Sequence, residues 1–480
     1  MTKAFCALAA AVLALMQPTS ILGATQPIFI SSPGVAQPII ITTNVFSTEP
    51  AATGQVAGIV TTQNPATSWA ITNCSGCANY FAINSGVITL TSAGAAAITT
   101  PRNYNIFITA ANSSASSAGM ITATFINTAA ACPRGVSATD GCLRAPVGTP
   151  QRPAILNGYA HRPSWNVAGV DYYVGAPVGT TLIDWQTLGT TPGIDISGNT
   201  LRCDGTYATS PSSNTVTLDG VDFSLHGGAT IYMPSGGCSG LFVTNSKFGA
   251  SGCANGSSSN YYLVQNQNAG AAVKFKYNTV NMLNCEMGVA AVLYTSGDVV
   301  VEYNYFYGLQ GQILQAAAGP YNVKYRFNLV DTSYYQYLPT NHMNLQEYGG
   351  AVSGVSDLVA YNTVYQPSNA PNMGGGEIFQ FYGNSGGVQT GAALMNNTII
   401  ALDTGSCKAT LTGCLVSYAI HGTGKYSPAT TVNGPAYNMN NFFDTSGMYG
   451  AYYAGSMTTA LGWTSSGNID MKTGATITPQ

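Results

Sequence analysis

The sequence predicts an all-β protein in which a long solenoid of strands follows a smaller β-sandwich. One eight-residue phrase recurs eight times between Val216 and Phe443, as expected for a repeat architecture. Apolar and polar residues alternate within the phrase, which is the period of a half-buried strand. Glycine and asparagine interrupt the chain throughout, which favours short strands and turns over long helices.

The N-terminus, residues 1–24, has the features of a signal peptide. Lys3 is followed by an apolar stretch from Ala4 to Met16 and a turn-rich exit that ends at Ala24. This stretch is too short to span a membrane, and no later apolar segment reaches the roughly 18 residues that a membrane-spanning helix needs. We therefore expect a secreted or cell-surface protein with no membrane span.

Residues 25–130 contain short alternating segments that predict about seven strands of a β-sandwich. The runs FAINSGVITL and YNIFITAANSSASSAGMITATFI resemble cadherin-like and immunoglobulin-like modules of bacterial surface proteins. Glu49 is the only acidic residue between Thr25 and Ala130, so the calcium ligands of true cadherins are absent. We expect a spacer or docking module.

Residues 131–165 carry two cysteines and five prolines, which predicts a disulfide-containing linker and cap. Residues 167–175 and 180–188 are then expected to begin the solenoid and to cover its open end.

The repeated phrase has three informative places. The third and eighth places are apolar and should face inward, whereas the fourth place should face water because unpaired charges are rarely buried. The sixth place predicts a turn whose amides stack from coil to coil. The fourth place holds Asp219, Thr244, Lys276, Glu302 and Arg326. The sixth place holds Asn278, Asn304, Asn328, Asn362, Asn397 and Asn441.

This asparagine column resembles that of the right-handed parallel β-helix family typified by pectate lyases. The resemblance implies a right-handed parallel β-helix over residues 166–450, with residues 451–480 as a C-terminal cap or tail. The aromatic residues before the asparagines should stack in the core; they are Tyr277, Tyr303, Phe327 and Tyr361.

Export would place ten cysteines in an oxidising compartment. Spacing suggests local disulfides without proving them, and it leaves Cys203 and Cys285 to pair with each other or to stay free. The suggested pairs are Cys74 with Cys77, Cys132 with Cys142, Cys238 with Cys253, and Cys407 with Cys414.

One segment, TNHMNLQEYGG at 340–350, combines several reactive residue types. His342 is a candidate base and Glu347 a candidate acid. β-helix proteins of the resembled kind often carry His-x-Asp-x-x-Gln on such a strand, but here Asn344 stands in place of the acid. The candidate substrate-binding residues are Asn344, Gln346, Gln315, Gln380, Tyr334, Tyr335 and Tyr337.

Gln346 is expected to align with Gln315 and Gln380 in a glutamine column. That alignment separates the nearest carboxylates, Glu347 and Glu377, by about 13 Å along adjacent strands, which is wide for glycoside hydrolysis.

Charged residues form 7% of the chain and the net charge is −3, which excludes a nucleic-acid-binding surface. No spacing typical of a metal or cofactor site is present. The sequence therefore favours a protein that binds, and as a lyase or hydrolase cleaves, an extracellular polysaccharide. The alternative is a non-catalytic, adhesive surface rod with the N-terminal module as its spacer.

Overall fold

The structure is a computed structural model, and only part of the chain is described. The described residues are 40–47, 53, 56–62, 66–98, 102–112, 115–125, 135–137, 148–163, 165–191, 193–203, 215–249, 262–281, 290–294, 297–308, 312–316, 321–332, 346–348, 355–367, 377–380, 389–403, 416–421, 436–453, 455 and 457–479. The expected signal peptide lies outside this set.

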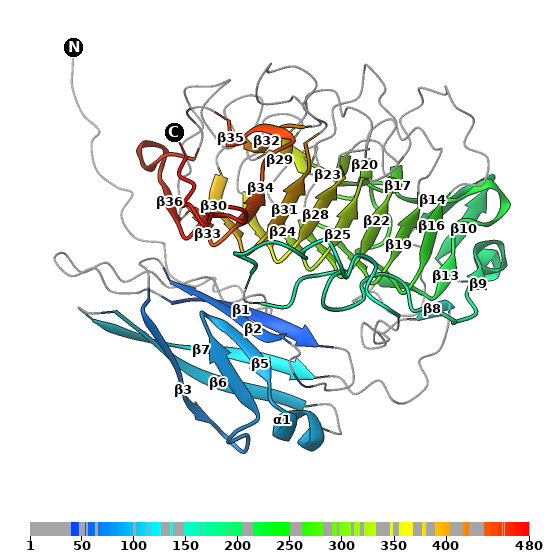
Figure 1. Ribbon diagram of the computed structural model, residues 1–480. Helices are drawn as coiled ribbons and strands as arrows, with labels where there is room; N and C mark the ends of the chain where they lie inside the picture. Colours follow the sequence, from blue (N-terminus) through cyan, green and yellow to red (C-terminus); the bar gives the residue numbers. More distant parts are fainter. Residues whose placement is uncertain are drawn as a thin grey trace, which may run out of the picture.

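The N-terminal unit is a β-sandwich with strand order β3-β6-β7-β1-β2-β5-β4 (Figure 1). β1 pairs with β2 over its first half and with β7 over its second half, so it joins both layers. Ile88 and Leu90 from one layer meet Ile106, Ile108 and Ile121 from the other in a buried core. The elements are β1 Ile40–Ser47, β2 Val56–Thr62, β3 Ser68–Cys74, β4 Phe81–Asn84, β5 Val87–Leu90, α1 Ser92–Ala97, β6 Arg102–Ala111 and β7 Ser116–Phe125.

The solenoid is a parallel β-helix with three long sheets, as the repeat predicts, and the described strands give ten to each sheet. The first sheet contains β8 Gly135–Ser137, β12 Thr215–Asp219, β15 Gly240–Thr244, β18 Ala272–Lys276, β21 Gly297–Glu302, β24 Tyr321–Arg326, β27 Val355–Ala360, β30 Gln389–Met395, β33 Ala436–Met439 and β36 Trp463–Ser466. The second contains β9 Ile183–Asp184, β13 Val221–Asp222, β16 Lys247–Gly249, β19 Thr279–Asn281, β22 Tyr305–Tyr307, β25 Leu329–Asp331, β28 Thr363–Gln366, β31 Thr398–Ala401, β34 Phe442–Asp444 and β37 Ile469–Asp470. The third contains β10 Ile194–Ser197, β11 Thr200–Cys203, β14 Thr230–Met233, β17 Tyr262–Asn266, β20 Ala290–Tyr294, β23 Gln312–Ala316, β26 Gln346–Tyr348, β29 Glu377–Gln380, β32 Val416–His421 and β35 Met448–Tyr452.

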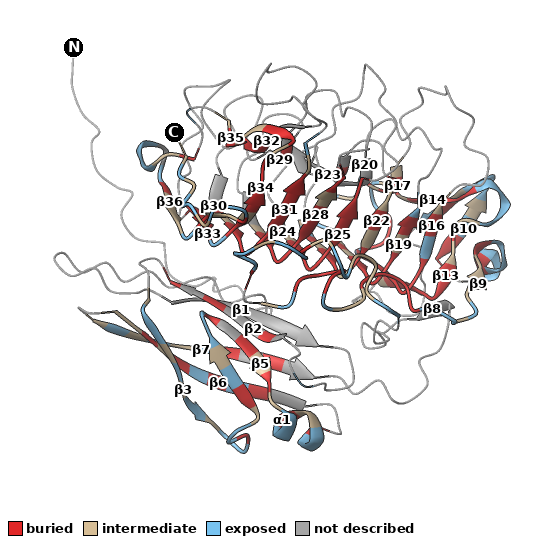
Figure 2. Cartoon of the chain, viewed as in Figure 1, coloured by how far each residue is buried: buried red, intermediate tan, exposed pale blue. Residues whose placement is uncertain are grey.

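Each coil contributes one strand to each sheet in turn, and the described pairs are parallel except β8 with β12 and β10 with β11. The solenoid continues past the expected boundary at residue 450, because β36 and β37 extend the first and second sheets. Inward residues of the repeat fill one continuous core (Figure 2). Phe223 and Phe248 stack there with ring centroids 4.6 Å apart.

The asparagine column is a buried hydrogen-bonded ladder at the corner between the first and second sheets. The Asn328 Oδ1 atom accepts the backbone N–H of Asn304 at 2.9 Å, and its Nδ2 donates to the Val301 carbonyl at 2.9 Å. The same pattern runs from Ser246 to Asn468, one coil beyond the last asparagine named from the sequence. The ladder therefore satisfies buried backbone groups that the turn leaves unpaired.

The aromatic residues before the asparagines adopt left-handed backbone conformations. Tyr277, Tyr303, Phe327 and Tyr361 have φ angles of 54°, 56°, 57° and 58°. Bulky residues rarely occupy this region. Their rings stack with centroids 4.7–5.3 Å apart. The stack is buried, as expected, but Phe327 and Tyr361 belong to a buried cluster that is separate from the main core of the solenoid.

The segment 148–178 is a strap that crosses the outer face of the second sheet. Trp165 packs on Tyr361 and Phe442, and the Gly175 N–H donates to the Tyr303 carbonyl. Tyr159 hydrogen-bonds Asp444, and a Cβ on Gly169 would lie 2.4 Å from Leu329. Residues 167–175, expected to begin the solenoid, thus lie along its flank instead. Further along this segment, β9 and the 3₁₀ helix Trp185–Thr190 lie at the end of the solenoid, where Trp185 is fully buried.

The expectation that the fourth place faces water is wrong. Asp219, Thr244, Lys276, Glu302 and Arg326 retain 1–9% exposure. Their charges and hydrogen bonds are paired along the row: Lys276 Nζ lies 3.1 Å from Glu302 Oε2, and Arg326 binds the other oxygen. Burial raises the pKa of Glu302, but Arg326 and Lys276 outweigh it and lower that pKa to about 2. The predicted charge ladder exists, but it is buried.

The disulfides agree with one expected pair and correct another. Cys74 is bonded to Cys77, whereas Cys238 is bonded to Cys203 and not to Cys253. Cys203 ends β11 on one coil and Cys238 precedes β15 on the next, so they meet although 35 residues separate them. Cys132, Cys142, Cys253, Cys285, Cys407 and Cys414 lie outside the described residues. Within the described part, no helix is long and apolar enough to cross a membrane.

Replacing Asn328 by Leu should leave two buried backbone groups unpaired, the Asn304 N–H and the Val301 carbonyl. Each unpaired group should lower the free energy of unfolding by about 1–3 kcal/mol. Chemical denaturation measures the change in unfolding free energy. Asn281→Leu, at an exposed position on β19, is the control. Equal stability of the two variants would contradict a structural role for the ladder.

Glu302 should make the free energy of unfolding depend on pH in the acidic range. Its folded pKa is depressed from 4.5 to about 2, so its contribution is complete above pH 4.5 and disappears as pH falls towards 2. Protonation of Glu302 should lower the free energy of unfolding by about 3 kcal/mol. Glu302→Gln should be less stable at neutral pH, because two cations stay buried unpaired, and should lose less stability between pH 4.5 and 2. The control is Asp195→Asn, at an exposed carboxylate. Parallel wild-type and Glu302→Gln curves would contradict the assignment.

Candidate functional site

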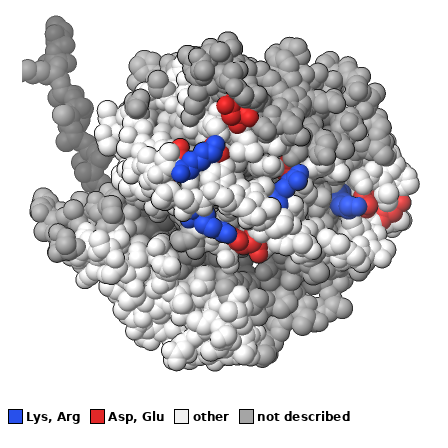
Figure 3. Space-filling model, in the orientation of Figure 1, with Lys and Arg blue, Asp and Glu red and all other residues white. Residues whose placement is uncertain are grey.

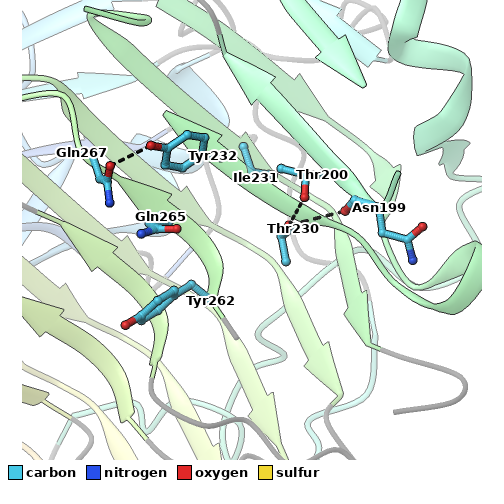
Figure 4. Close-up of a pocket in the computed structure, with 8 residues that line it drawn as sticks. All are labelled: Asn199, Thr200, Thr230, Ile231, Tyr232, Tyr262, Gln265 and Gln267. Carbon is cyan, nitrogen blue, oxygen red and sulfur yellow. Dashed lines mark hydrogen bonds between the residues drawn. The ribbon is translucent and has the colours of Figure 1, made fainter. Parts of the chain in front are cut away.

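The outer face of the third sheet carries a groove over its first coils. Eight residues line a space of about 460 Å³, which lies within the range of about 300–1,000 Å³ typical of ligand sites. They are Asn199, Thr200, Thr230, Ile231, Tyr232, Tyr262, Gln265 and Gln267 (Figure 4). β11, β14 and β17 supply most of the lining.

Strand register brings these side chains together. Thr200 is registered with Thr230, and Tyr232 with Gln265 on the next coil. Leu201, Ile231 and Val264 occupy the inward positions of the same strands and are fully buried. Because side chains alternate between the two faces of a strand, burial of this row presents Thr200, Thr230, Tyr232 and Gln265 to the groove.

Hydrogen bonds hold the groove side chains in place. The Tyr232 hydroxyl donates to Gln267 Oε1 at 2.7 Å, and the Thr200 and Thr230 hydroxyls are 3.2 Å apart. In Figure 4 the Gln265 amide lies between the rings of Tyr232 and Tyr262. The guanidinium of Arg202 lies 5.5 Å from the centroid of the Tyr232 ring. The site thus offers two aromatic rings beside oriented amides and hydroxyls.

The residues that line the groove are uncharged, although the Arg202 guanidinium lies beside them against the Tyr232 ring. Among the described residues that line the groove, none is Asp, Glu, Lys, Arg or His. Burial raises the pKa of Tyr262, so its hydroxyl remains protonated and available as a donor at neutral pH. The described lining offers rings, amides and hydroxyls, a set of groups suited to binding a polar ligand.

The residues expected to form a site lie further along the same sheet, where they are described. Gln315 is on β23, Gln346 and Glu347 are on β26, and Gln380 is on β29. His342, Asn344, Tyr334, Tyr335 and Tyr337 lie outside the described residues.

The register corrects the expected glutamine column. Gln346 is registered with Leu314 and Phe379, whereas Glu347 is the residue registered with Gln315. The alignment was wrong by one residue, because the repeated phrase covers the first two strands of each coil and gives no register for the third. Glu347 consequently falls three positions from Glu377, about 10 Å along the strands.

The groove residues were not predicted from the sequence, although two segments of the sequence carry a pattern that points to them. TIYM at 230–233 alternates polar and apolar residues, and YLVQNQ at 262–267 has a run of three amide side chains directly after an apolar pair. Aligning these third strands of successive coils would have placed Tyr232 beside Gln265.

The other histidines of the described part pair or pack within the protein. His226 Nε2 lies 2.7 Å from Asp184 Oδ2, and this bond lowers the pKa of Asp184. His421 is buried and stacks on Tyr453. No group of three His, Cys, Asp or Glu residues among the described residues is placed to hold a metal ion.

Comparisons with protein-family models, curated proteins and solved structures found no match to this chain. The chemistry of the groove is therefore the guide to its ligand.

Proposed function

We propose that this is a secreted or cell-surface protein that binds a neutral extracellular polysaccharide in the groove of the third sheet. The observation that carries the proposal is the combination of two tyrosine rings with amides and hydroxyls in an uncharged lining.

Sugars match this chemistry. Their C–H faces pack on aromatic rings, and their hydroxyls exchange hydrogen bonds with amides, which both donate and accept. The bond from Tyr232 to Gln267 fixes a ring and an amide before any ligand arrives, which reduces the entropic cost of binding. The eight lining residues include no cation, although Arg202 lies beside them against the Tyr232 ring.

The surface and the disulfides support an extracellular glycan ligand. On the face shown in Figure 3, the described charged side chains are few and scattered. Both described disulfides suit an oxidising compartment. In this proposal the β-helix is of the pectate-lyase-like kind, and the sandwich is a cadherin-like spacer without calcium ligands.

We assign binding to the groove and no cleavage. A glycosidase uses two carboxyls about 5–9.5 Å apart. The carboxyls of the candidate site, Glu347 and Glu377, are about 10 Å apart along the strands and lie several coils from the groove.

The test is a binding screen with xylan, galactan, dextran and laminarin, and with polygalacturonate as the charged comparison. Tyr262→Ala and Gln265→Ala should each weaken binding of the best neutral polysaccharide by about fivefold, because each removes about 1 kcal/mol of contact. Isothermal titration calorimetry gives the affinities. Tyr307→Ala, a partly exposed tyrosine on the outer face of the second sheet, is the matched control.

Unchanged affinity in both groove variants would place the binding site elsewhere. Absence of binding to every polysaccharide would favour the non-catalytic rod. Release of new reducing ends from a bound polysaccharide would show that the protein also cleaves.

A further inference from the structure

A tyrosine cluster lies at the far end of the same sheet. Tyr418 is on β32, Tyr449 is on β35, and Tyr453 directly follows β35. The Tyr418 ring centroid is 5.9 Å from that of Tyr449 and 5.1 Å from that of Tyr453, and both pairs are inclined at 71°. All three side chains are partly exposed. Such a group of partly exposed rings is unusual for a position that only closes a core.

Strand alternation places Tyr449 and Tyr453 on the outer face, whereas Tyr418 has the parity of the buried Ile420 and its partly exposed ring joins the cluster through contacts with the other two rings. Tyr452 belongs to the interior core, so alternation along β35 directs Tyr453 to the outer face. Tyr449, four residues earlier, shares that parity. The Tyr418 ring contacts both and passes over Gly450, where an added Cβ would lie 3.6 Å from the ring.

The cluster is pre-ordered without a ligand. His421 stacks on Tyr453 with centroids 4.4 Å apart and planes inclined at 16°. His421 is itself 1% exposed, so it holds the Tyr453 ring from the protein side. A ring fixed in this way loses little conformational entropy when a sugar packs on it.

The groove and the cluster lie on the same sheet. From β14 to β32 the third sheet passes through β17, β20, β23, β26 and β29, which is six strand steps. At about 4.8 Å for each step the two sites are about 29 Å apart along the solenoid axis. Figure 1 shows these strands side by side along the solenoid.

We propose that the tyrosine cluster is a second sugar-stacking site, and that the ligand is a long polysaccharide lying along the third sheet and contacting both sites. This inference rests on the proposed function and specifies its ligand as a polymer. Two linked contacts can raise apparent affinity by about 10²–10⁴ over either alone, because the second binding event is intramolecular. Short oligosaccharides occupy one site at a time and bind weakly.

The experiment compares long and short fractions of the neutral polysaccharide that binds best in the screen. Tyr418→Ala should weaken binding of the long fraction by about tenfold or more and leave binding of a trisaccharide at the groove unchanged. Tyr262→Ala should weaken binding of both fractions. Tyr418→Phe keeps an aromatic ring and should retain most of the affinity, which separates stacking from loss of the hydroxyl. Tyr307→Ala is again the control, and thermal melts establish that each variant is folded.

Tyr449→Ala provides a second test of the cluster if Tyr418→Ala does not fold. Equal affinity for long and short fractions, with Tyr262→Ala alone weakening both, would overturn the two-site inference and leave the proposed function intact. Loss of long-chain binding in the cluster variants with no effect of Tyr262→Ala would instead overturn the assignment of the groove. Failure of every neutral polysaccharide to bind would overturn both.

Discussion

The asparagine ladder is the interaction on which the rest of the solenoid depends. Each amide pairs with a backbone N–H and a carbonyl of the preceding coil, so the corner repeats with one geometry from Ser246 to Asn468. The corner holds bulky residues such as Tyr303 and Phe327 in a left-handed conformation that is costly alone. Ring stacking and the strap residue Trp165 compensate that cost.

The asparagine ladder fixes how successive coils align at the corner between the first and second sheets. The third sheet, on which we propose that the ligand binds, follows the same alignment. The first and second sheets are held by the ladder, and the inward residues of the third sheet follow the same coil-to-coil spacing. The outer rows of β14 and β17 therefore align Tyr232 with Gln265, and no separate device is needed to assemble the groove. The strap covers the second sheet, which leaves the third sheet as the face on which the groove is open.

Sequence reasoning succeeded where the side chain alone determines the structure. An asparagine recurring at one place, with apolar residues at fixed offsets, requires a buried polar column beside a strand. Sequence reasoning failed where burial, register or disulfide pairing depends on another part of the chain. Glu302 and Arg326 were expected in water because the pattern shows polarity but not what covers it. Gln346 was displaced by one residue because loops of unequal length separate the third strands. Cys203 pairs with Cys238 because coil stacking shortens a separation that is long in sequence.

The most direct measurement is a crystal structure of the full chain with an oligosaccharide of the best-binding neutral polysaccharide. The account predicts sugar rings against Tyr262 and Tyr232, with hydroxyls hydrogen-bonded to Gln265 and Gln267. Sugar density on the strap, on the sandwich or between the loops, with the groove occupied only by water, would contradict it.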